Sequence, residues 1–154
     1  MMIWTTHFTR KKAVLSVLLL GAVLALAISL AANRDAAQTE LPVLESNEAR
    51  VEYLHSLGWE VQPEPLETLQ FQMPEALEEP YLSYQELQDA QGFDFTRSCG
   101  KQVSRYTYAV TNYPGRPEGV QANLYICDDQ PVGGDIFCAG ADGFQDTLVF
   151  PEDG

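Results

Sequence analysis

Residues 120–127, VQANLYIC, alternate strictly between apolar and polar side chains. The apolar positions are Val120, Ala122, Leu124 and Ile126. The polar positions are Gln121, Asn123 and Tyr125. Because successive side chains of a strand point to opposite faces, this pattern predicts a strand with one buried face. It is the clearest such pattern in the chain, and the rest of the sheet is predicted outward from it.

The neighbouring segments predict further antiparallel strands. Residues 102–112 alternate and end in a YPG turn, residues 132–138 follow a DDQP turn, and residues 144–150 add an edge strand. Gly133 and Gly134 predict a bulge in the strand that holds them. Residues 102–138 therefore predict a three-strand meander.

The DDQP turn sets an expected register for its two strands. With Asp129 and Gln130 at the tip, Cys127 faces Val132 and Cys138 faces Gln121. The two cysteines are then too far apart for a disulfide, which requires Cα atoms within about 7 Å. Cys99 makes the total three, with no CxxC or Cys/His zinc spacing, so buried free thiols are expected. An oxidising exterior would still permit one bridge, which would have to include Cys99.

Two helices are predicted before the meander. The first begins at Ser46 or Asn47, which can cap it, and stops at Gly58. A half-buried strand follows at residues 66–73, then a helix at residues 80–91. The order helix, strand, helix, three-strand meander predicts an α+β domain with both helices packed on one face of an antiparallel sheet.

A long apolar segment, residues 13–32, precedes this domain. Its twenty uncharged residues would form a helix of about 30 Å, the thickness of the hydrocarbon core of a bilayer. Three basic residues stand directly before it, so a transmembrane anchor with a cytoplasmic N-terminus and an extracytoplasmic domain is predicted. The alternative is a signal peptide, cleaved at a small-x-small site, and a secreted domain.

The chain then divides into five parts. These are a cytoplasmic tail at 1–12, the anchor or signal peptide at 13–32, a linker at 33–45, the domain at 46–150 and a tail at 151–154. Five basic residues oppose 22 acidic ones after Arg34, a net charge of −17. Such a charge excludes nucleic acid and anionic lipid surfaces as binding partners, and leaves the bilayer contacted only through residues 13–32.

Several blocks resemble an uncharacterised family of clostridial and related Firmicutes proteins, catalogued as domain of unknown function 4830 (DUF4830). They are LGWEV at 57–61, QDAQGFDF at 88–95, GK at 100–101, RYTY at 105–108, TNYP at 111–114 and GGDI at 133–136. The resemblance covers residues 47–136 and implies a small protein with one N-terminal membrane segment. This chain departs from the pattern at Pro80 and at Ser98-Cys99. No catalytic residue is carried over.

Catalytic, metal and cofactor sites find little support in the sequence. GGDIF at 133–137 resembles the GGDEF motif of cyclic-dinucleotide synthases, but the domain is too short and a glycine bulge is the better interpretation. A thiol enzyme would have to use His55 as its base. Asp128, Asp129 and Asp135 could hold calcium, although turn-forming aspartates are more common. We therefore predict no catalytic residue, metal or cofactor.

Four tyrosines form the candidate recognition surface, namely Tyr106, Tyr108, Tyr113 and Tyr125. Aromatic side chains are enriched at binding surfaces, although the same spacing is also typical of a half-buried sheet face. The leading hypothesis is a non-catalytic binding or regulatory module of the cell envelope, with a protein, peptide or glycan partner. The alternative, which leaves enzymatic activity open, is a small secreted or envelope hydrolase with clustered carboxylates.

Overall fold

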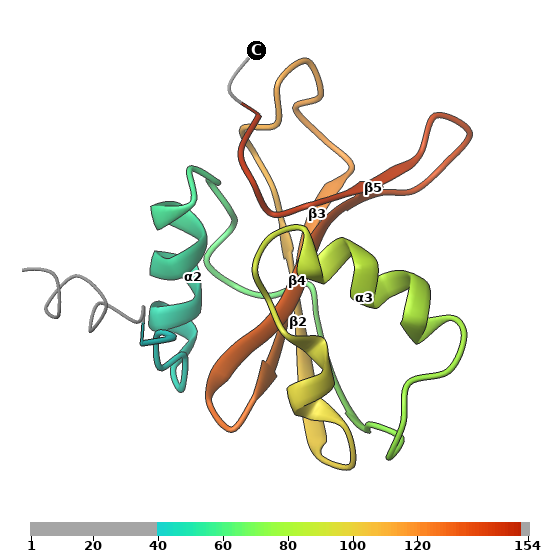
Figure 1. The fold of residues 1–154 in the computed structure, drawn as a ribbon. Coiled ribbons are helices and arrows are strands. Elements are labelled where there is room, and N and C mark those ends of the chain that lie inside the picture. Colours follow the sequence, from blue (N-terminus) through green and yellow to red (C-terminus); the bar gives the residue numbers. More distant parts are fainter. Residues whose placement is uncertain (1–39, 152–154) are drawn as a thin grey trace, which may run out of the picture. The chain divides into compact units, whose positions relative to one another are not determined.

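A five-stranded antiparallel sheet forms the centre of the domain (Figure 1). The computed structural model describes residues 40–151, and those beyond Glu40 belong to one compact unit, Leu41–Gly154. The strands lie side by side in chain order and are β1 (Glu67–Gln72), β2 (Gln102–Ala109), β3 (Val120–Cys127), β4 (Gln130–Cys138) and β5 (Phe144–Asp146). With two helices they make the predicted α+β fold. The meander is longer than predicted, because β1 pairs with β2 and β5 pairs with β4.

The helices are α2 (Asn47–Ser56) and α3 (Tyr81–Asp89), with a short 3-10 helix, η1 (Phe95–Ser98). Ser46 caps α2 as predicted, since its hydroxyl accepts a hydrogen bond from the Ala49 N–H at 3.1 Å. Gly58 follows α2 with a φ of +97°, the left-handed conformation that glycine adopts without strain. Within residues 40–151 no helix has the length and hydropathy to cross a bilayer. The predicted anchor at residues 13–32 lies outside the described residues.

The expectation that both helices pack on one face of the sheet is wrong. α2 covers the face formed by Tyr108, Ala122 and Ile136, which are paired across three strands and buried. α3 covers the other face (Figure 1). There Tyr84 of α3 and Phe95 of η1 pack against Tyr125. We refer to these as the α2 face and the α3 face.

The alternation in β3 is confirmed on the α2 face. Its four apolar side chains are all buried in a core that also holds Leu54 and Trp59. Leu44 belongs to this core as well, and its N–H donates to the Asp129 carbonyl at 2.7 Å. The domain therefore begins before Ser46, inside the stretch predicted to be linker.

The hairpin between β3 and β4 differs from the predicted register. Cys127 pairs with Gln130 and Cys138 with Val120, so the tip is Asp128-Asp129. Both aspartates have positive φ, 51° and 59°, as the central residues of a type I′ hairpin turn require. The register shifts between Tyr125, which pairs with Gly133, and Ile126, which pairs with Pro131. The bulge in β4 therefore lies just before Gly133. As predicted, Cys127 and Cys138 are not bonded to each other, and the three cysteines are free.

Two glutamines fasten α3 and the turn after it to β4. The buried Gln88 accepts a hydrogen bond from the Gly134 N–H at 2.8 Å through its side-chain oxygen. Gln91 donates to the Gly134 carbonyl at 2.8 Å and accepts from the Leu148 N–H at 2.7 Å. The β5 pairing covers only Ile136–Cys138, so these side chains take the place of a neighbouring strand at Gly134.

Candidate binding site

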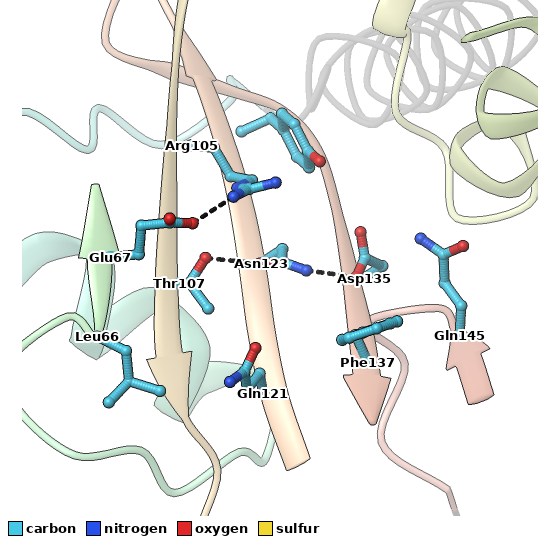
Figure 2. A pocket seen from close by; sticks show the side chains of 10 residues that line it. Leu66, Glu67, Arg105, Thr107, Gln121, Asn123, Asp135, Phe137 and Gln145 are labelled. Carbon is cyan, nitrogen blue, oxygen red and sulfur yellow. Dashed lines mark hydrogen bonds and ion pairs between the residues drawn. The ribbon is translucent and has the colours of Figure 1, made fainter. Parts of the chain in front are cut away.

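A row of polar residues crosses the α3 face of the sheet. Glu67, Thr107, Asn123 and Asp135 are paired directly from β1 to β4. Directly paired residues of an antiparallel sheet project from the same face, so the four side chains stand side by side (Figure 2). The alternation that buries the apolar half of β3 therefore also places Asn123 in this row.

Hydrogen bonds connect three members of the row and α3. The Thr107 hydroxyl donates to Asn123 Oδ1 at 2.7 Å, and Asn123 Nδ2 donates to Asp135 Oδ1 at 2.8 Å. The Tyr84 hydroxyl donates to Asp135 Oδ2 at 2.5 Å. Since a carboxylate only accepts, Asp135 fixes the orientation of the Asn123 amide. The row is a rigid, directional chain.

Asp135 is the buried charge of the site, with 1% of its surface exposed. Burial raises the pKa of Asp135, and hydrogen bonds from Tyr84, Asn123 and Gln145 oppose that shift by stabilising the charged form. Burial, followed by the nearby Asp135 carboxylate, raises the pKa of Tyr84 far above the usual phenol value. The phenol consequently keeps its proton and acts as the donor.

Arg105 of β2 extends over the same face. Its Nη2 forms an ion pair with Glu67 Oε2, and the two side chains are 27% and 57% exposed. Its Nε is buried and has no hydrogen-bond partner within the described residues. One edge of the guanidinium is therefore only half used.

Two hollows of about 480 and 460 Å³ open on this face and meet at Arg105, Tyr125 and Gln145. We call the first the polar hollow; its lining also includes Thr107, Gln121, Asn123, Asp135 and Phe137 (Figure 2). We call the second the aromatic hollow; its lining also includes Leu69, Phe71, Tyr81, Tyr84 and Phe95. Together they offer hydrogen-bonding groups on one side of Arg105 and aromatic surface on the other.

Aromatic contacts hold Tyr125 between the two hollows. Its ring lies 5.4 Å from that of Tyr84, 5.6 Å from that of Phe95 and 6.4 Å from that of Phe71, measured between centroids. The rings of Phe95 and Phe71 meet it edge to face, an arrangement favoured by the aromatic quadrupole. Tyr125 and its neighbouring rings thus form a packed wall of the aromatic hollow.

The four tyrosines predicted as a recognition surface are not brought together. Tyr106 and Tyr108 point to the α2 face, where the Arg50 guanidinium lies 3.8 Å from the centroid of the Tyr106 ring. Tyr108 is fully buried and its hydroxyl accepts from Arg50 Nε at 3.2 Å. Tyr113 stacks on Trp59, with centroids 5.9 Å apart. Of the four, only Tyr125 lines the site.

The residues that sequence reasoning missed are Tyr84, Arg105, Asn123 and Gln145. The signal for two of them was present, since Arg105 and Asn123 occupy the polar positions of alternating strands. The predicted recognition surface takes Tyr125 from this side of β3 but none of the polar residues beside it. Tyr84 comes from α3, which lies over the sheet, and Gln145 from β5, the edge strand paired with β4; both placements are set by tertiary contacts.

The other chemical candidates do not converge. Asp128 and Asp129 form the hairpin tip, whereas Asp135 pairs with Asn123 several residues along the strand. No group of His, Cys, Asp or Glu able to hold a metal ion occurs in the part of the chain that the structure describes. Gly133 and Gly134 lie beside the bulge, in tight contact with Gln88 and Leu148, which agrees with a structural role.

The two carboxylates of the site, Glu67 and Asp135, have different surroundings. Glu67 and Asp135 are separated by three strand spacings, about 14 Å between Cα atoms. Glycosidases hold two carboxyl groups on either side of the bond that they cleave, whereas here Glu67 is engaged in an ion pair with Arg105 and Asp135 is buried. The arrangement provides a single buried carboxylate that orients neighbouring groups.

Comparison with known proteins identifies no relative: no protein-family model, no curated protein and no solved structure matches the chain.

Proposed function

We propose that this chain is a membrane-anchored extracytoplasmic protein whose domain is a non-catalytic binding or regulatory module of the cell envelope. The ligand lies in the polar and aromatic hollows of the α3 face. The observation that supports this most is the ordered row from Thr107 through Asn123 to Asp135 beneath an open, partly aromatic surface. Fixed donors and acceptors beside aromatic rings are what small-ligand and peptide sites require.

The cellular setting belongs to the same proposal. Residues 13–32 anchor the chain in the bilayer, and the basic residues before them keep the N-terminus in the cytoplasm. A secreted form after signal cleavage remains the alternative. Membership of the DUF4830 family is likewise proposed, on the QGFD block and the RYTY and TNYP blocks.

Photo-crosslinking in the producing cells tests the binding function. A photoreactive amino acid is placed at Gln121, which lines the polar hollow, and in a matched variant at Glu52, an exposed position of α2. We expect a discrete crosslinked product from position 121 and none from position 52. The absence of a product from position 121, at normal protein abundance, would contradict the proposal.

A further inference from the structure

Arg105 carries a half-filled binding edge at the point where the two hollows meet. The Nε–H and Nη2–H of an arginine lie parallel along one edge and match the two oxygens of a carboxylate. Here Nη2 contacts one oxygen of Glu67, while the neighbouring Nε is buried without a partner in the described chain. Buried donors without a partner are rare, so this Nε–H is a donor that an acceptor entering the hollows could use.

The ion pair between Glu67 and Arg105 is one that a ligand can displace. It lies on β1, an edge strand, and its side chain is 57% exposed. Exposed ion pairs contribute little to stability, because water solvates both partners and screens the attraction. A ligand carboxylate that filled both Nε and Nη2 would form the stronger, bidentate contact.

The surroundings of Arg105 specify what the carboxylate is attached to. On one side the aromatic hollow, lined by Phe71, Tyr81 and Tyr84, accepts an apolar or aromatic side chain. On the other side Gln121, Asn123 and Gln145 line the polar hollow with amide groups. Such groups pair well with backbone amides, so the combination fits a short peptide.

We propose that Arg105 binds the carboxylate of a peptide whose neighbouring apolar side chain enters the aromatic hollow, and that Glu67 occupies Arg105 until the peptide arrives. The inference rests on the proposed binding function and adds the ligand class. Because the residues after Arg34 have a net charge of −17, the preferred peptide carries no negative charge besides its terminal carboxylate.

The test is a titration of the purified full-length chain followed by NMR of its backbone amides and arginine Nε–H groups. The probes are N-acetyl-alanyl-phenylalanine with a free carboxylate, the same peptide with a C-terminal amide, and glucuronic acid. We expect the free acid to shift the Arg105 Nε–H signal and to bind at least about tenfold more tightly than the amide. Equal binding of acid and amide, no binding of either, or preferential binding of glucuronic acid would overturn the proposal.

Substitutions separate this role from a structural one. Arg105→Gln and Arg105→Lys should each weaken binding of the free acid about tenfold. Glutamine removes the charge, and lysine retains the charge but lacks the two parallel N–H donors of the guanidinium. Arg97→Gln is the control, because Arg97 lines neither hollow. Glu67→Gln should strengthen binding about two- to fivefold by removing the competing carboxylate. Weaker or unchanged binding in Glu67→Gln would contradict the occupancy by Glu67.

The two proposals fail differently. Crosslinking from position 121 together with no preference for the free acid would retain the binding site and remove the carboxylate assignment. Loss of crosslinking would remove the binding function on which the assignment rests.

Discussion

Asp135 makes the stability of the domain depend on pH in a specific direction. Burial raises its folded-state pKa above the usual 3.8, so the folded protein binds this proton more tightly than the unfolded chain. The contribution of Asp135 is therefore fully present below the unfolded pKa and is lost as the pH rises through the folded pKa. Urea unfolding from pH 4 upward should show the wild type losing stability relative to Asp135→Asn. A difference that grows in favour of the wild type would contradict this.

Gly134 leaves no room for a side chain. A Cβ atom there would lie 2.2 Å from Leu148 Cδ1 and 2.8 Å from the Asn123 carbonyl oxygen. We expect Gly134→Ala to lower the free energy of unfolding by about 1–3 kcal/mol through overpacking. Because shortening Leu148 removes one of the two clashes, the double variant with Leu148→Ala should cost less than the sum of the single variants. Strict additivity in urea unfolding would show that Leu148 is not the obstacle.

At the level of elements, the position of α3 depends on Gln91. Its side chain serves both the Gly134 carbonyl and the Leu148 N–H. Gln91→Leu leaves both groups without partners and should destabilise the domain by about 1–3 kcal/mol per buried group that stays unsatisfied. Glu86→Leu, at an exposed position of α3, is the matched control. Equal unfolding midpoints for the two variants would show that the Gln91 bonds do not hold the segment after α3.

The sequence was sufficient to predict the elements but not their placement on the sheet. The alternation of residues 120–127 correctly identified the α2 face, because a strand buried on one face has an apolar residue at every second position. The second face escaped prediction because α3 is fastened there by Gln88 and Gln91, which resemble surface residues in sequence. Hydrogen bonds of this kind have no periodic signature. The hairpin tip lies one residue earlier than predicted, which moves the partner of Cys127 by two residues and that of Cys138 by one. Two adjacent aspartates in a DDQP turn allow more than one tip.

The candidate site was predictable only in part. Tyr125 was selected for its aromatic ring, although Asn123 lies on the same side of β3 and Arg105 is paired with Tyr125 from β2. Their meeting with Asp135 depends on the register of three strands. The buried state of Asp135 depends in addition on Tyr84 from a helix 51 residues away in sequence. Long-range arrangements of this kind are fixed by tertiary packing.

For the whole molecule, the charge distribution predicts orientation in the membrane. Arg10, Lys11 and Lys12 precede the apolar segment, and all 22 acidic residues follow it. Alkaline phosphatase, which is active only outside the cytoplasm, should be active in whole cells when fused after Gly154. An inactive fusion at normal abundance would contradict this orientation. A shortened, soluble product would favour the cleaved signal peptide.

The measurement that most directly tests ligand binding on the α3 face is amide shift mapping of the full-length chain. The ligand is a mixture of soluble glycan and peptide fragments from the envelope of the producing cells. We predict that shifts concentrate at Arg105, Asn123 and Asp135, with the amides of α2 unchanged. Shifts concentrated on α2 around Arg50, or no shifts at saturating fragment concentration, would contradict a binding site on the α3 face.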